Sequence, residues 1–177
     1  MSNGWGLSCR NCGYHKKVHL GCGFLFPKVY SDTLKAAREG KLGSKVQSFL
    51  ENHPDGALNC DRVLLQCEQC GLLTEDLDLS MYIPSHPITP EPERKWSVAF
   101  PFEGSEYVTS RDLEQHYLLA ASFEHLCPDC QKPMKIITSK DMQEKEKAGY
   151  RNGEMSSEIS CPSCKAALVF TEFINWD

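Results

Sequence analysis

The stretch CRNCGY (9–14) is the first of four C-x2-C motifs, and these motifs decide the fold of this chain. The others lie in CEQCGL (67–72), CPDCQ (127–131) and CPSCK (161–165). A C-x2-C turn directs two sulfurs at one point, and two such turns that face each other supply the four thiolates of a tetrahedral Zn²⁺ site. An even number of motifs therefore predicts two structural zinc ions per chain. The expected ligands are Cys9, Cys12, Cys67, Cys70, Cys127, Cys130, Cys161 and Cys164.

These motifs resemble the zinc knuckles of the zinc-ribbon superfamily. Gly13 and Gly71 follow the second cysteine of the first two motifs, at a position where a tight turn prefers glycine. The last two motifs carry a proline after the first cysteine, as many ribbon knuckles do, but they place Gln131 and Lys165 at the glycine position. The whole chain looks like small bacterial proteins built on zinc ribbons. This resemblance implies a fold element and a metal, and it implies no activity.

Four motifs can be combined into two sites in three ways. Sequential pairing is the simplest, and it joins the first motif to the second and the third to the fourth. The later site then closes over 30 intervening residues, near the usual ribbon spacing, and the earlier site closes over 54. Loop-closure entropy grows slowly with length, so the longer insertion is no objection. An interleaved arrangement, first with third and second with fourth, is the alternative.

Composition places the chain among globular proteins. It has 177 residues, of which 41% are hydrophobic, 24% are charged and ten are cysteines. The first residues, MSNGWGLSCR, contain no apolar stretch of signal-peptide length, so we expect a cytoplasmic protein that does not enter membranes. In a reducing compartment, cysteines at this density indicate metal ligands in preference to disulfides. A thioredoxin-like redox pair would need one C-x2-C at the start of a helix, a setting that these turns lack.

The predicted fold class is α+β, with two zinc ribbons of short antiparallel strands. Residues 1–83 form the first ribbon unit, with a helical insertion at about 14–60. Residues 84–93 form a Pro-rich connector, residues 94–124 a strand and a helix, and residues 125–177 the second ribbon.

Local patterns predict the individual elements. Ser31 caps a short helix that ends at Gly40, and a second helix follows Ser44. A strand with Trp96, Val98 and Phe100 on one face precedes a helix over 111–125. We expect Thr109 or Ser110 to cap this last helix, and its buried stripe to be Leu113, Tyr117, Leu118 and Ala121. The expected strands cover 62–66, 72–83, 134–138, 158–160 and 166–174, and a charged hairpin extension or short helix covers 140–154.

Charge is unevenly distributed along the chain. The formal net charge is −5, but residues 1–50 hold eight basic residues against two acidic ones. Within residues 14–45, lysines alternate with aromatic rings, a combination that holds single-stranded nucleic acid. The candidate contacts are Lys16, Lys17, Lys28, Phe24 and Phe26. The simpler interpretation is that the rings form a small core around the first zinc while the lysines are solvated.

Four residues outside the motifs are further candidates. Cys22 lies between two glycines near Lys17 and His19, a setting in which a thiol can be reactive, although a small residue in a turn is the simpler interpretation. Cys60 has no such setting and is expected to be a buried or bystander thiol. His15 and His19 lie near the first motif and can replace a cysteine as metal ligands.

The sequence favours a non-catalytic interaction or adaptor protein with two four-cysteine zinc sites, whose partner is another protein. Four thiolates close the coordination shell, whereas a catalytic zinc keeps an open position. One alternative is a nucleic-acid-binding protein that uses residues 14–45. Another alternative is a thiol enzyme that uses Cys22. Zinc and iron both occupy four-thiolate sites, so the motifs leave the choice of metal open.

Overall fold

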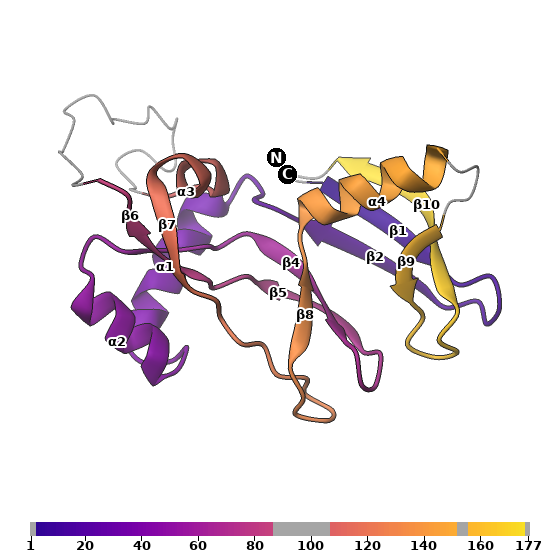
Figure 1. The fold of residues 1–177 in the computed structure, drawn as a ribbon, viewed down its shortest axis with the longest axis horizontal. Helices are drawn as coiled ribbons and strands as arrows, with labels where there is room; N and C mark the ends of the chain where they lie inside the picture. The colour runs from indigo at the N-terminus through magenta and orange to yellow at the C-terminus, as the bar shows by residue number, and fades with distance from the viewer. Residues whose placement is uncertain (1–2, 87–106, 152–155, 176–177) are drawn as a thin grey trace. The chain divides into compact units, whose positions relative to one another are not determined.

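A computed structural model describes residues 3–86, 107–151 and 156–175 of the chain (Figure 1). The chain divides into two compact units, each built from segments that are not contiguous. Unit 1 comprises Met1–Gly23, Arg62–Leu77 and Glu124–Asp177, and unit 2 comprises Phe24–Asp61 and Asp78–Phe123. The described residues form four helices and ten strands in three antiparallel sheets, so the predicted α+β class is confirmed.

A four-stranded sheet in unit 1 joins the two ends of the chain. Its order is β2-β1-β10-β9, with β1 at Asn3–Ser8, β2 at His15–Leu20, β9 at Ser156–Ser160 and β10 at Ala167–Asn175. Strand β1 pairs with β2 on one side and with β10 on the other, as Figure 1 shows by the contact of indigo and yellow strands. Strand β2 alternates, because Val18 and Leu20 are buried while Lys17 is exposed.

Helix α4 (Ser139–Arg151) packs on this sheet. Its Met142 is fully buried in the same core as Trp5, Leu7 and Leu168. The indole nitrogen of Trp5 donates a hydrogen bond of 3.0 Å to a carboxylate oxygen of Glu146. Thr138 and Asp141 form a reciprocal cap at the start of the helix. The charged segment 140–154, predicted as a hairpin extension or a short helix, is therefore helical up to Arg151.

A three-stranded sheet completes unit 1. Its order is β5-β4-β8, with β4 at Arg62–Cys67, β5 at Leu73–Leu77 and β8 at Met134–Ile137. Successive side chains of a strand point to opposite faces, and β4 buries both. Leu64 joins the core of the four-stranded sheet, whereas Val63 and Leu65 pack in a separate cluster with Cys67 and Cys127.

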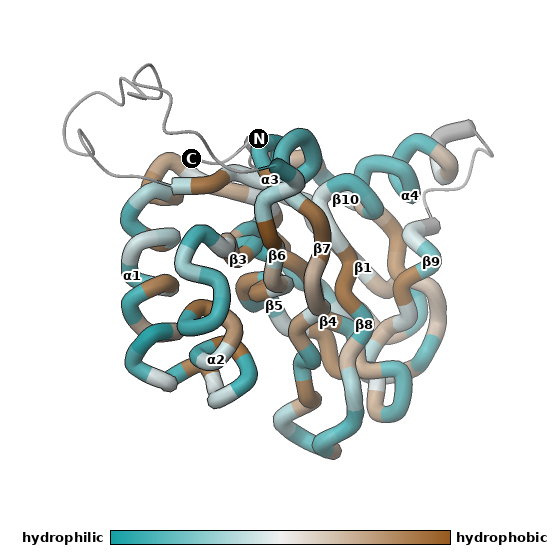
Figure 2. Tube along the Cα trace, turned by 60° about the vertical axis from the view of Figure 1, so that its left-hand side comes forward, coloured by the Kyte–Doolittle hydropathy of each residue, from teal (hydrophilic) through white to brown (hydrophobic). Residues whose placement is uncertain are grey.

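Unit 2 combines helices with a small sheet. Helix α1 spans Phe26–Arg38 and α2 spans Ser44–Asn52. The sheet order is β3-β6-β7, with β3 at Ala57–Leu58, β6 at Met81–Pro84 and β7 at Tyr117–Ala121, and α3 (Ser110–His116) precedes β7. Figure 2 shows hydrophilic and hydrophobic residues alternating along α1, as expected for a helix with one buried face.

Several predicted elements are confirmed. Helix α2 begins at Ser44, and α1 ends just before Gly40, whose φ of +74° suits the left-handed residue that follows a helix. Helix α1 begins five residues before Ser31, at Phe26, because Pro27 supplies the fixed φ of a first turn. The prediction that Ser31 caps this helix is therefore wrong.

The predicted helix over 111–125 is wrong beyond its first turns. The capping box of Thr109 and Asp112 is present, and Leu113 is buried. The chain then becomes strand β7, which pairs with β6, so Leu118 is 58% exposed and belongs to no buried helical stripe. The strand expected over 72–83 is also divided, because Leu79 adopts a φ of +61° between β5 and β6.

Two predicted features fall partly or wholly outside the described residues. They are the strand with Trp96, Val98 and Phe100 and most of the Pro-rich connector, of which Pro84 lies in β6. Among the residues that the structure describes, no helix is long and apolar enough to cross a membrane.

Candidate metal centres

The eight cysteines of the C-x2-C motifs come together in two groups, both within unit 1. In each group the four sulfurs lie within 4.8 Å of one another. We call the first group the terminal cluster, because it joins the two ends of the chain, and it consists of Cys9, Cys12, Cys161 and Cys164. The central cluster consists of Cys67, Cys70, Cys127 and Cys130.

This pairing is nested, so the sequential pairing predicted above is wrong. The first motif joins the fourth and the second joins the third. The interleaved alternative is wrong as well, and the two motifs of residues 125–177 do not share a site. The reason lies in the sheets. Strand β1 pairs with β10 and brings the first and last motifs together, and β4 pairs with β8 and does the same for the middle two.

All four motifs adopt the same backbone turn. The residue after the second cysteine donates its backbone N–H to the carbonyl of the first cysteine, over 2.8–3.0 Å in every motif. That residue has a left-handed φ in each case: +73° at Gly13, +84° at Gly71, +56° at Gln131 and +64° at Lys165. A side chain in this conformation costs about 1–2 kcal/mol, so Gln131 and Lys165 hold a strained geometry that glycine would adopt freely.

The sulfur geometry fits a tetrahedral metal ion. The shortest distances are 3.3 Å from Cys9 Sγ to Cys164 Sγ and 3.4 Å from Cys67 Sγ to Cys130 Sγ. Metal–sulfur bonds of about 2.3 Å in a tetrahedron place sulfurs roughly 3.8 Å apart, close to these values. A disulfide needs about 2.05 Å, and all ten cysteines are free thiols.

Backbone amides prepare at least one cysteine of each cluster to bind a cation. The N–H of Cys12 favours the thiolate of Cys9 and lowers the pKa of Cys9 to about 6, and the N–H of Cys70 does the same for the pKa of Cys67. In Cys12 the N–H of Tyr14 favours the thiolate, but burial and the neighbouring sulfurs prevail and raise the pKa to about 12. Without metal, such thiols share protons, and a divalent cation would replace those protons.

The two clusters differ in exposure. Each contains two buried cysteines, which are the first cysteines of the four motifs. In the terminal cluster Cys12 and Cys164 are exposed, whereas in the central cluster Cys70 and Cys130 are half-buried. The central cluster also lies beside the apolar side chains of Val63, Leu65 and Met134. Solvent therefore reaches the terminal cluster more readily.

Comparisons with known proteins assign no relative. No family model matches this chain, and no curated protein or solved structure matches it. The resemblance to zinc ribbons therefore rests on the motifs themselves and on the two four-cysteine groups that they form.

The remaining cysteines and the two candidate histidines lie outside both groups. Cys22 is half-buried, and Cys60 is 2% exposed in unit 2, as predicted for a buried thiol. Burial raises the pKa of Cys60 to about 12, which keeps it a thiol at neutral pH. His15 and His19 are absent from the metal-binding groups found among the described residues.

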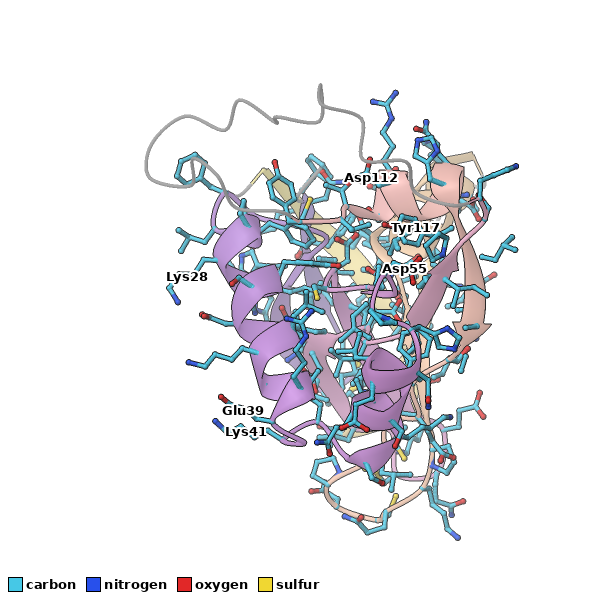
Figure 3. The ribbon with its side chains drawn as sticks, turned by 90° about the vertical axis from the view of Figure 1, so that its left-hand side faces the viewer. Lys28, Glu39, Lys41, Asp55, Asp112 and Tyr117 are labelled. Carbon is cyan, nitrogen blue, oxygen red and sulfur yellow. The ribbon has the colours of Figure 1, made fainter. Side chains whose placement is uncertain are left out.

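The basic aromatic segment 14–45 is divided between the two units, and acidic side chains accompany its cations. Lys17 Nζ lies 2.9 Å from a carboxylate oxygen of Glu172, and Lys16 Nζ lies 3.8 Å from one of Glu75. Lys28 pairs with Asp32 on the exposed side of α1, where Figure 3 shows it, and Lys41 pairs with Glu39 over 2.6 Å.

The aromatic side chains of this segment also separate. Phe24 is 64% exposed, whereas Phe26 is buried in unit 2 beside Tyr30 and Tyr107. Tyr14 alone packs against the core of unit 1. The rings therefore form neither one stacking surface nor one core around a zinc site.

Lys165 and Gly71 are site residues that sequence reasoning missed. Lys165 donates its Nζ hydrogen to the carbonyl oxygen of Cys70, a residue of the other cluster. One signal was available, since lysine stands where ribbon knuckles usually have glycine. The role of this lysine could be recognised only once it was known which motifs are neighbours in the fold.

Proposed function

We propose that this chain is a cytoplasmic, non-catalytic interaction protein in which two zinc ions have a structural role. The observation that carries this proposal is the composition of the two metal-binding groups, each of which supplies four sulfurs. Four thiolates fill the tetrahedral shell of Zn²⁺ and leave no position for water or a substrate. Free thiols at this density also suit a reducing compartment.

The proposed partner is another protein. Support comes from strand β7, which is an edge of its sheet within the part of the chain that the structure describes and carries two exposed leucines, Leu118 at 58% and Leu119 at 56% exposure. Unpaired edge strands with apolar side chains are common places for a second chain to bind. The lysines of the alternative nucleic-acid surface have acidic neighbours instead, so we favour the protein partner.

The test is the native mass of the protein purified gently from its own cells without chelator. Two zinc ions per chain are the expected result, together with additional mass from a bound protein. One metal ion or none would contradict the two closed sites. A Leu118→Ser/Leu119→Ser variant should keep both metal ions and lose the additional mass. Retention of that mass would exclude β7 as the binding surface. Bound nucleic acid would instead support the alternative function, nucleic-acid binding through residues 14–45.

A further inference from the structure

The two metal-binding clusters are joined by a contact between their knuckles. Lys165 follows Cys164 of the terminal cluster, and its Nζ donates to the carbonyl oxygen of Cys70 in the central cluster. A second contact lies next to it. The Nε2 of Gln66 donates over 3.3 Å to the carbonyl oxygen of Ser160, and these two residues directly precede Cys67 and Cys161.

Gly71 provides the space for this contact. A Cβ added at Gly71 would collide with Lys165 Nζ and would lie 3.4 Å from the Cα of Pro162. Gly13 occupies the equivalent position in the first motif with a similar left-handed φ, and a Cβ there would meet nothing within 4 Å. The left-handed backbone explains both glycines, but the space that Lys165 occupies is particular to Gly71.

Lys165 itself is held in a conformation that its residue type disfavours. Its φ is +64°, where an L side chain costs about 1–2 kcal/mol relative to glycine. Gln131 has the same backbone conformation in the third motif, but its side chain bonds to Pro128 of its own knuckle over 3.3 Å. Of these two residues with a strained backbone, only Lys165 has a side chain that reaches the other cluster.

We propose that Lys165 is a positioning residue that couples metal binding at the two clusters. Metal in the terminal cluster holds the fourth knuckle in shape and so places the ammonium group of Lys165. Metal in the central cluster holds Cys70 and so places the carbonyl that accepts from it. Each metal ion orders one half of the contact, and binding of the first therefore favours binding of the second.

Charge gives the ammonium group a second effect. Four thiolates around a divalent cation carry a net charge of −2, so two loaded clusters repel each other. A cation bonded between them offsets this repulsion. Because Lys165 is exposed, we expect coupling at the low end of the usual range, about fivefold in affinity.

The experiment is a Cd²⁺ titration of the metal-free full-length protein, followed by native mass spectrometry, which counts chains with no metal, one or two. For independent sites, at least half of the chains carry a single metal ion at half-saturation. We expect the wild-type fraction to fall below half. Lys165→Met removes the donor but keeps the strained backbone, so its single-metal fraction should be higher. Lys165→Arg should restore the wild-type distribution.

Gln131→Met is the matched control, since it removes a bond that stays within one knuckle at the same backbone position. It should behave as the wild type does. An unchanged distribution in Lys165→Met, or an equal change in Gln131→Met, would overturn the proposal. The ¹¹³Cd resonance of the central cluster provides a readout that misfolding does not imitate. The chemical shift of this resonance should differ between singly and doubly loaded wild-type chains, and it should be the same in singly and doubly loaded chains of Lys165→Met.

Discussion

The terminal and central clusters use the same four-sulfur geometry and the same backbone turn, yet they close very different lengths of chain. Cys9 and Cys164 are 155 residues apart in sequence, whereas Cys67 and Cys130 are 63 apart. The terminal cluster exposes two of its cysteines, and the central cluster lies beside an apolar group of side chains. The two clusters therefore offer a metal ion the same set of ligands, and they differ in the length of chain that each closes and in their exposure to solvent.

The largest expected effect tests the nested pairing itself. Cys9→Ser should reduce the metal content from two ions to one, at a cost on the order of 10 kcal/mol for a structural zinc site. Alkylation and peptide mass mapping should then label Cys12, Cys161 and Cys164, while the central cysteines stay protected. Labelling of Cys67 and Cys70 instead would indicate sequential pairing. Cys22→Ser is the control and should retain both metal ions.

A second test separates the two faces of β4. Leu64 is fully buried in the core that also contains Cys9 and Cys161, and Leu65 packs with Cys67 and Cys127. Each alanine variant should lower the free energy of unfolding by about 2–5 kcal/mol. Leu64→Ala should also speed metal loss from the terminal cluster, and Leu65→Ala from the central one. Metal release followed by alkylation mapping measures this, and identical labelling in both variants would contradict the assignment.

A third test compares the exposure of the clusters in the wild-type protein. A chelator in excess should remove metal from the terminal cluster several-fold faster than from the central cluster, because Cys12 and Cys164 are exposed to solvent. Native mass spectrometry over time, with rapid alkylation of the single-metal species, should find the label on the terminal cysteines. Equal labelling of both clusters would show that exposure does not govern release.

The smallest effect concerns a thiol outside both clusters. Burial raises the pKa of Cys60 from 9.0 to about 12, so the folded state holds this proton more tightly than the unfolded state. Its contribution to stability is complete below pH 9 and is lost as the pH rises from there toward 12, by up to about 1.4 kcal/mol per pH unit. Urea unfolding of unit 2 should show this loss between about pH 8 and pH 10, with the hydrogen exchange of α1 as the measure of unfolding.

Cys60→Ala should reduce this alkaline loss, and Cys22→Ala should leave it unchanged. If the free energy of unfolding falls with pH equally steeply in the wild type and in Cys60→Ala, this thiol does not contribute to the alkaline loss of stability. The metal-binding clusters serve as an internal reference, because the metal count at each pH reports whether unit 1 remains loaded.

Local sequence predicted local structure well where a few residues suffice. Gly40 ends α1, Ser44 begins α2, and Thr109 with Asp112 caps α3, because these effects act within one turn of a helix. The prediction failed at Tyr117–Ala121, whose apolar residues fit either a helix or a strand. Pairing with β6 stabilises the strand, and a contact with a segment distant in the sequence cannot be predicted from a few neighbouring residues.

The sequence by itself determined the ligand type, the number of four-cysteine groups and the mixed α+β class, because C-x2-C spacing and helix signals act over a few residues. Tertiary structure alone decided which motifs share a site, since loop closure depends weakly on length and the sheets choose the neighbours. It also decided the role of Lys165. A lysine in place of glycine is a local departure from a pattern, and it becomes a contact between clusters only when Gly71 leaves room beside it.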